Sequence, residues 1–347
     1  PAILTEHAKS LLAGFSEVIK QSEKIIDSLQ DGMDNNELSG NREANEQWLT
    51  TVSMARFRAE SAAALWRSYA SDATKEKPPN ARWMALVEAG QGMFDIELNA
   101  SPILAANALK SALWSRCYGA VLTSATLTAL GSFDRFSMRA GLVPSPFRHA
   151  EAAELYIPAM DCDAGNAEAH TAAIIEMLPT LLDADAGSLV LFSSRKQLRA
   201  VREGVSAEWQ GRILAQDDLP KHEILSRHRE CLDEGRGSVI FGLASFAEGV
   251  DLPGKYCSHV VIAKIPFAVP EDPVEEALAE WISRNKGNPF MDITVPDAAV
   301  RLIQASGRLL RNEADTGRIT ILDRRMVSRH YGRKMLASMP PYRQIIE

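Results

Sequence analysis

Apolar positions recur at helical spacing in the first part of the chain. Residues 5–30 carry one such stripe, residues 46–69 carry a second, and the polar segment 31–41 separates them. Residues 70–82 are polar and contain two prolines, which is typical of a linker. The pattern predicts a helical hairpin or small bundle over the first ~85 residues.

Beyond residue 90 the pattern changes to short apolar runs that alternate with amphipathic stretches. Such βαβ alternation predicts a parallel sheet covered by helices. The predicted strands are 93–98, 119–127, 188–194, 212–216, 238–243, 259–267 and 318–323. The predicted helices are 101–114, 167–183, 195–205, 220–234 and 297–311. The first of these helices has Ser101 as its expected N-cap and Pro102 at its first position, and 119–127 reads as a buried strand running into a Ser/Thr loop.

Composition narrows the class of protein. The chain has 347 residues, of which 46% are hydrophobic and 24% charged, so it is globular and long enough for about two or three domains. No apolar run approaches the ~20 residues that span a bilayer, and no secretory signal begins the chain. The four cysteines stand far apart, which fits free thiols. We expect a cytoplasmic protein without a membrane partner and without a metal site in this chain.

Charge is unevenly distributed along the chain. The net charge is −7, which by itself argues against a nucleic-acid partner. Residues 301–347, however, hold ten Lys or Arg and four acids, so that this segment carries +6 and the rest −13. A basic zone on an acidic body is compatible with a local site for a polyanion.

The segment QASGRLLR at 304–311 sets one amide and two guanidinium groups at regular spacing. In a helix, Gln304, Arg308 and Arg311 fall on one narrow stripe, because positions i, i+4 and i+7 overlie one another. The opposite side is covered by Leu302, Ser306, Leu309 and Leu310. Two interpretations are open: a solvated surface helix, or two arginines directed at an anion shared with another domain.

The segment SFAEGVDLPG, residues 245–254, directly follows a predicted strand. Ligands of α/β proteins bind beyond the carboxyl ends of parallel strands. Gly249 permits close backbone approach, and Glu248 and Asp251 place carboxylates on either side of a tight turn. Such a loop suits a magnesium-bound water, a ribose hydroxyl or a main-chain amide that faces a phosphate. An ordinary acidic turn is the alternative.

Two further strand ends carry hydroxyl groups. Ser193, Ser194 and Arg195 stand where a predicted strand runs into a helix, and hydroxyls with exposed amides there form a phosphate seat. Simple helix capping is the alternative. Ser124 and Thr126 end another predicted strand, which alone indicates only a turn.

Taken in order, four segments resemble motifs III to VI of a superfamily 2 helicase. They are TSATL (123–127), LVLFSSRKQ (189–197), SFAEGVDLPG (245–254) and QASGRLLR (304–311). The last two resemble the XPD-like branch, and most closely the bacterial DinG family. Segments that fit the same family are SFDRF (132–136), IPFAVPEDPV (265–274), NPF (288–290) and ILDRR (321–325). The resemblance covers residues 90–347, whereas the helical first part matches only in position, as the arch insertion of such helicases.

The resemblance implies an α/β fold, with a RecA-like parallel-sheet motor domain of the P-loop NTPase class and an N-terminal all-helical arch segment. It implies an arch-like segment over 1–88, the C-terminal strands of motor domain 1 over 89–135, and motor domain 2 over 136–347.

The resemblance also implies roles for the residues in these motifs. Arg308 and Arg311 would be arginine fingers on the γ-phosphate of ATP, and Gln304 would help to align the attacking water. The nucleotide side of the cleft would include Glu248, Gly249 and Asp251. Coupling of hydrolysis to domain movement would fall to Ser124 and Thr126. Contacts to the backbone of single-stranded DNA would come from Ser193, Ser194 and Arg195, whereas Phe246 is a candidate for base contact or, preferably, core packing.

The implied protein is a monomeric, ATP-dependent 5′→3′ DNA helicase of repair or replication, which uses ATP with magnesium and acts on single-stranded or forked DNA. The chain contains no GxxxxGK[ST] and no DEAH box, and does not begin with Met. In the family those motifs and an iron–sulfur domain precede the arch, so we expect a C-terminal part that is inactive alone. The alternatives are a non-catalytic nucleic-acid- or partner-binding fragment and a DinG-type exonuclease relative. The second is disfavoured because the chain shows no clustered acidic nuclease site.

Overall fold

A computed structural model describes residues 2–34, 42–71, 78–90, 92–124, 126–133, 141–268 and 272–347. The chain divides into two compact units. The first comprises Pro1–Ala120 and Pro270–Gly287, and the second comprises Val121–Val269 and Asn288–Glu347. Parts of three quoted motifs lie outside the described residues, namely Ala125, 134–136 and 269–271.

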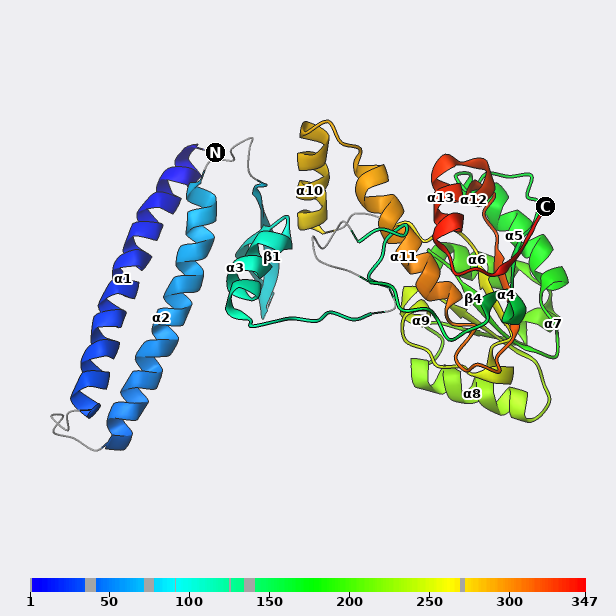
Figure 1. Ribbon diagram of the computed structural model, residues 1–347, viewed down its shortest axis with the longest axis horizontal. Helices are drawn as coiled ribbons and strands as arrows, with labels where there is room; N and C mark the ends of the chain where they lie inside the picture. Colours follow the sequence, from blue (N-terminus) through cyan, green and yellow to red (C-terminus); the bar gives the residue numbers. More distant parts are fainter. Residues whose placement is uncertain are drawn as a thin grey trace. The chain divides into compact units, whose positions relative to one another are not determined.

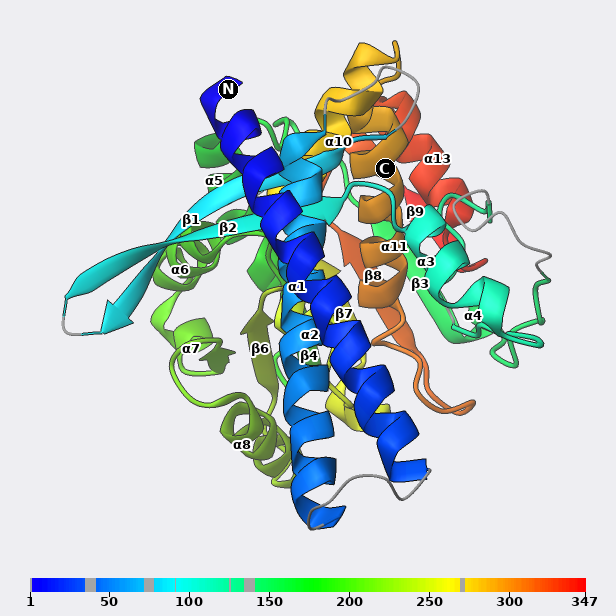
Figure 2. The ribbon, with the colours of Figure 1, turned by 90° about the vertical axis from the view of Figure 1, so that its left-hand side faces the viewer.

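The first unit opens with two long helices that lie side by side (Figures 1 and 2). They are α1 (Ala2–Asp34) and α2 (Arg42–Ala70), so the predicted helical hairpin is confirmed. Small buried side chains, Ala8 on α1 and Ala59 and Ala63 on α2, allow the helices to approach closely.

A two-stranded antiparallel ribbon follows in the first unit, and Figure 2 shows its length. Its strands are β1 (Asn80–Gly90) and β2 (Met93–Pro102), and the unit also contains α3 (Ala105–Ala112), the 3-10 turn η1 (Trp114–Arg116) and α10 (Pro273–Arg284). The predicted helix start at Ser101 and Pro102 is wrong, because both residues pair with β1 and the helix begins at Ala105. The predicted linker over 70–82 is likewise too long, since β1 begins at Asn80.

The second unit is built on a seven-stranded sheet in which every neighbouring pair is parallel. The strand order is β5-β6-β4-β7-β8-β3-β9, which confirms the predicted RecA-like parallel sheet. The strands are β3 (Ala153–Ile157), β4 (Gly187–Leu191), β5 (Ile213–Ala215), β6 (Ser238–Gly242), β7 (His259–Ile262), β8 (Gly317–Ile321) and β9 (Arg343–Ile346). Of these, β3 and β9 were not predicted from the sequence.

Helices connect these strands and cover both faces of the sheet (Figure 1). They are α4 (His149–Ala152), α5 (Ala167–Leu181), α6 (Arg195–Gly204), α7 (Ala207–Gln210), α8 (Lys221–Asp233), α9 (Ala244–Ala247), α11 (Val295–Ser306), α12 (Arg325–Ser328) and α13 (His330–Ser338). Two short turns complete the unit, the 3-10 turn η2 (Gly254–Tyr256) and the π-helical turn η3 (Phe290–Thr294).

The core follows from the alternation of side chains along buried strands. Leu189 on β4 belongs to a cluster that includes residues of α11 and α13, whereas its neighbour Val190 belongs to a cluster with residues of α5 and α6. Both faces of the sheet are therefore buried, which is why these strands read as continuous apolar runs rather than as alternating ones.

The predicted buried strand over 119–127 is wrong. Residues 117–124 form no regular element, and Val121 is 93% exposed. An apolar run forms a buried strand only where neighbouring strands and covering helices are supplied. None of the strands in the described part of the chain pairs with residues 119–124.

Candidate functional site

The segment SFAEGVDLPG (245–254), here named the acidic loop, follows the carboxyl end of β6. The short helix α9 opens the loop, and its Phe246 is buried in the core against Gly242, which settles its role as core packing. Glu248, Gly249 and Asp251 follow it and are exposed. The loop therefore anchors itself through one aromatic side chain and presents its two carboxylates outward.

Gly249 lies against the flexible end of the Lys221 side chain. A Cβ at this position would lie 2.8 Å from Nζ of Lys221, which donates a hydrogen bond to the Ser245 carbonyl over 2.5 Å. Any side chain at position 249 would displace this lysine from the loop. Lys221 thus adds a cation against the loop, beside Ser245 and Gly249, that no motif in the sequence indicated.

The two arginines of the QASGRLLR segment do not lie on a helix. Helix α11 ends at Ser306, with Gly307 as its C-cap, so the predicted helical stripe through Arg311 is wrong. The two guanidinium groups converge nevertheless. Nη1 of Arg308 donates to the Val250 carbonyl over 3.0 Å, and Nη2 of Arg311 donates to the same oxygen over 2.6 Å. The acidic loop, rather than helical spacing, brings the pair together.

The arginine pair keeps unused hydrogen-bonding capacity. Among the described residues, Nε of Arg308 and Nε of Arg311 are buried and have no hydrogen-bond partner. The Arg311 Nε lies 3.5 Å from Oδ1 of Asp251, an ion pair beyond good hydrogen-bond length. Burial, and after it the neighbouring Arg311, lower the pKa of Arg308, while Glu248 and Asp251 oppose that shift. Because arginine stays protonated in proteins, two full positive charges meet at one neutral carbonyl.

Gln304 reaches the Ser/Thr segment. Its Nε2 donates to Oγ1 of Thr126 over 3.4 Å, and the Thr126 main-chain N donates to Oγ of Ser124 over 3.2 Å. The structure thus brings Gln304 together with Ser124 and Thr126, two segments separated by 178 positions in the chain at their point of contact. Arg308, by contrast, is joined to the acidic loop.

Ser193, Ser194 and Arg195 lie at the start of α6 and are all exposed. Ser194 is the N-cap of this helix and accepts a hydrogen bond from the Gln197 main-chain N at 3.5 Å. Nε of Arg195 donates to Oδ2 of Asp217 over 2.9 Å. The capping role of Ser194 is therefore observed, and the exposed hydroxyl of Ser193 has no such structural role.

Gln216 and Asp217, which directly follow β5, connect the start of α6 to the acidic loop. Oε1 of Gln216 accepts hydrogen bonds from the Leu243 main-chain N (2.9 Å) and from the Ser245 hydroxyl (3.3 Å). Asp217, the next residue, holds Arg195 and has φ +78°, in the left-handed region. Sequence reasoning missed both, although polar residues directly after a short strand were a usable signal.

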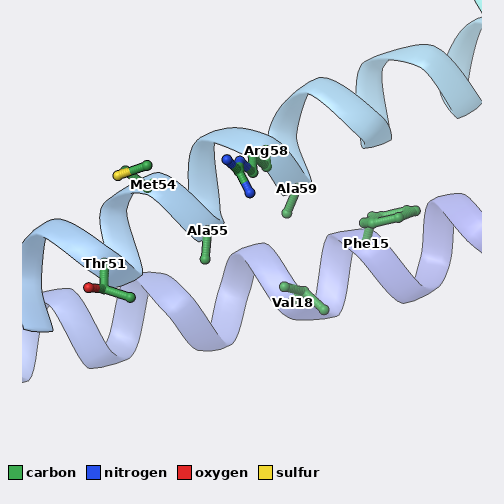
Figure 3. Close-up of a pocket in the computed structure, with 7 residues that line it drawn as sticks. All are labelled: Phe15, Val18, Thr51, Met54, Ala55, Arg58 and Ala59. Atoms are coloured by element: carbon green, nitrogen blue, oxygen red, sulfur yellow. The ribbon is translucent and has the colours of Figure 1, made fainter. Parts of the chain in front are cut away.

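A separate pocket lies between α1 and α2 (Figure 3). Its lining residues are Phe15, Val18, Thr51, Met54, Ala55, Arg58 and Ala59. The lining contains one hydroxyl and one cation, with no carboxylate, histidine or cysteine. The pocket follows from alanines on α2 facing larger side chains on α1, and we assign it no chemistry.

The described residues show neither a metal-binding cluster nor a membrane-spanning helix. They contain no group of three or more His, Cys, Asp or Glu side chains that could hold a metal ion. None of their helices has both the length and the apolar character needed to cross a bilayer. The four cysteines are free thiols, and burial raises the pKa of Cys257 to about 12.

Comparison with known proteins places this chain in a family. A family model described as "Helicase C-terminal domain" matches residues 178–342. A relative from Photobacterium profundum, named ATP-dependent DNA helicase DinG, is 36% identical over 100% of this chain and 51% of its own length. The protein of that name from Escherichia coli is 32% identical over 83% of this chain and 42% of its own length. The chain spans about half the length of these relatives.

A solved structure supports the fold. Xpd4 from S. tokodaii matches 99% of this chain and 73% of its own chain, with a TM-score of 0.51 and 15% sequence identity. At that identity the match concerns the fold alone, and it agrees with the parallel sheet and the helical N-terminal segment described above. The chain therefore belongs to the DinG/XPD-like superfamily 2 helicases and corresponds to the C-terminal portion of such a protein.

Proposed function

We propose that the intact protein is an ATP-dependent 5′→3′ DNA helicase and that this chain supplies its arginine fingers and part of its single-stranded DNA path. The observation that carries the proposal is the meeting of Arg308 and Arg311 at the Val250 carbonyl, beside Asp251. Phosphoryl transfer is accelerated mainly by positioning and by positive charge at the transferred group, and guanidinium groups supply that charge with several donors.

On the nucleotide side, Glu248, Gly249 and Asp251 would face the ATP phosphates. Magnesium in such sites is usually held by one or two carboxylates together with substrate phosphates and water. The two exposed carboxylates of this loop fit a contact to magnesium-bound water, with the remaining ligands coming from ATP and from other parts of the intact protein. An iron–sulfur cluster of the intact protein would be held outside this chain, because the four free cysteines here are distant in sequence.

The attacking water would be aligned by Gln304, and the hydrogen bond from Gln304 to Thr126 supports a coupling role for Ser124 and Thr126. A change in the position of Gln304 during hydrolysis would reach the Ser/Thr segment through that bond. In this assignment residues 1–88 are the arch-like segment, residues 89–135 belong to the first motor domain and residues 136–347 are the second.

Single-stranded DNA would run across the start of α6. The hydroxyl of Ser193 and the side chain of Arg195 are both exposed, and the α6 N-terminus favours anions. The ion pair of Arg195 with Asp217 lies at the surface, where such pairs contribute little, so a phosphate can replace the carboxylate.

The deciding experiment is DNA-stimulated ATP hydrolysis by the full-length protein carrying Arg308→Ala or Arg311→Ala. An arginine finger is worth roughly 10³–10⁵ in rate, so each variant should lose nearly all turnover while remaining folded. Arg343→Ala is the matched control, because this arginine pairs with a carboxylate and lies away from the acidic loop. Normal hydrolysis in both test variants would return the pair to a structural role and favour a non-catalytic fragment.

A further inference from the structure

Asp315 is a buried carboxylate between α11 and β8. Its residue is 6% exposed. One oxygen, Oδ2, accepts hydrogen bonds from the main-chain N–H groups of Arg311 (2.7 Å) and Asn312 (2.8 Å). The other oxygen, Oδ1, accepts from the main-chain N–H of Gly254 over 3.1 Å. A single side chain thus receives three backbone donors, and main-chain bonds to a carboxylate are among the stronger hydrogen bonds.

The three donors come from two distant segments. Arg311 ends the QASGRLLR segment and Asn312 follows it directly, whereas Gly254 ends the acidic loop, 61 positions away from Asp315. Gly254 has φ +59°, in the left-handed region that glycine adopts without strain, and this conformation directs its N–H toward the carboxylate. The carboxylate therefore joins the backbones of the two segments that carry the proposed nucleotide contacts.

A purely local role would not need the third bond. The bonds to Arg311 and Asn312 alone would stabilise the turn before β8, as many aspartates do. In the part of the chain that the structure describes, the other polar links between the arginines and the acidic loop are made by the long side chains of Arg308 and Arg311 to Val250 and Asp251. The two segments also pack in one core cluster, which includes Val250 and Leu309. Packing of this kind fixes no single direction for the Arg311 main chain, whereas the hydrogen bonds through Asp315 tie specific N–H groups together.

We propose that Asp315 is a positioning residue that fixes the Arg311 backbone against the loop 248–254, so that the Arg311 guanidinium reaches the nucleotide phosphate in one orientation. The inference rests on the proposed function, because it assumes that Arg311 acts on a phosphate. Asp315 itself would touch neither ATP nor DNA and would act only through Arg311 and the loop.

The test is Asp315→Asn in the full-length protein. A carboxamide keeps one acceptor oxygen, so an NH₂ group must face either Gly254 or the Arg311–Asn312 pair, donor against donor. Misplacement of a catalytic group by about 1 Å costs about 10²-fold in rate, so we expect kcat for DNA-stimulated ATP hydrolysis to fall by that factor. The KM for ATP and the affinity for single-stranded DNA should stay near their wild-type values.

Two further variants sharpen the result. Asp315→Glu keeps the charge on a longer side chain and should restore part of the lost kcat. Glu313→Gln removes an exposed carboxylate two residues away and should leave kcat unchanged. Should Asp315→Asn fail to fold, Asp315→Glu alone decides, since a reduced kcat at unchanged KM supports the proposal and a wild-type kcat overturns it.

The outcomes separate this inference from the proposed function. If Arg311→Ala hydrolyses ATP normally, the finger role fails and the positioning role falls with it. If Arg311→Ala is inactive but Asp315→Asn keeps a wild-type kcat and only melts at a lower temperature, the positioning role alone is overturned. A loss of activity that merely follows the unfolded fraction would overturn it as well.

Discussion

Two pairs of arginines in the second unit differ in what lies between them. Arg308 and Arg311 both donate to the carbonyl oxygen of Val250. Arg318 and Arg343 both bind Glu154, one to each carboxylate oxygen, at 2.7 and 2.5 Å. The Glu154 side chain is only 11% exposed, whereas the side chains of Arg318 and Arg343 are 46% and 68% exposed.

The difference decides which pair is available to an anion. A carboxylate between two guanidinium groups cancels one of their two positive charges, whereas a neutral carbonyl cancels none. Asp251 lies 3.5 Å from Arg311, but its side chain is 74% exposed and its attraction is screened by water. An arginine pair is therefore suited to a phosphate when its shared acceptor is neutral, and exposure alone does not reveal this.

The largest expected effect is the loss of ATP hydrolysis when Arg308 and Arg311 are present without the rest of a nucleotide site. The chain contains neither a GxxxxGK[ST] loop nor a DEAH box, the groups that cradle phosphates and hold magnesium in such enzymes. We expect the isolated 347-residue chain to show no ATP hydrolysis, with or without single-stranded DNA. Phosphate release should be measured beside the full-length protein, and turnover of comparable size would contradict the prediction.

The surroundings of the second pair, Arg318 and Arg343, can be tested through the pH dependence of stability. A histidine, His259, lines the same pocket as these arginines and Glu154. Nε2 of His259 lies 2.7 Å from Oγ1 of Thr320, and burial, followed by Arg318, lowers the pKa of His259 to about 4. In the unfolded chain histidine binds a proton below pH ~6.5, whereas in the folded chain it stays neutral down to about pH 4. The stability contributed by neutral His259 is thus complete above pH ~6.5 and is lost as the pH falls toward 4.

The matching measurement is chemical unfolding of wild type and His259→Asn at pH 7 and pH 4. Between these pH values the difference in unfolding free energy should change by about 3 kcal/mol, the equivalent of the pKa shift. His222→Asn is the control for the exchange of histidine for asparagine, because His222 lies at the start of α8 and is exposed. If the unfolding free energies of wild type and His259→Asn change equally between pH 7 and pH 4, the burial of His259 does not make stability depend on pH.

The buried sheet was predictable because helices cover both of its faces. Strands β4, β6 and β7 therefore need apolar side chains at successive positions, and these appear in the sequence as continuous apolar runs. The same signal failed at 119–127, since an apolar run indicates burial against something without saying what covers it. Ser101 and Pro102 form a good helix start locally, but cross-strand pairing with β1 overrides that preference.

The candidate site was predictable in its residues but not in its geometry. Spacing singled out Arg308 and Arg311 through an assumed helix, yet the helix ends at Ser306 and the Val250 carbonyl makes them converge. Asp315 left no trace in the sequence, because a carboxylate that accepts backbone N–H groups needs no particular neighbours. Tertiary hydrogen bonds of this kind appear only when distant segments are placed together.

The smallest expected effects concern Arg195, a third arginine whose partner, Asp217, is an exposed carboxylate. We expect Arg195→Ala in the full-length protein to weaken single-stranded DNA binding and to reduce the log–log salt slope by about 0.7, the value for one neutralised phosphate. Sequence preference should stay weak, since backbone contacts carry no base information. Arg202→Ala is the matched control, because this residue lies on the same helix and pairs with Asp218 at 2.7 Å.

Ser194→Ala separates capping from DNA binding at the same helix start. Loss of the observed N-cap should lower stability by about 1 kcal/mol, which a melting curve detects. Affinity should then be measured at two salt concentrations and at a temperature where the variant stays folded. If Ser194→Ala and Arg195→Ala both keep the wild-type affinity and salt slope, the start of α6 has only a structural role. The DNA path must then cross another part of the unit. In that case a neutral acceptor or an exposed carboxylate as the partner of an arginine would not be enough to identify that arginine as a phosphate-binding residue.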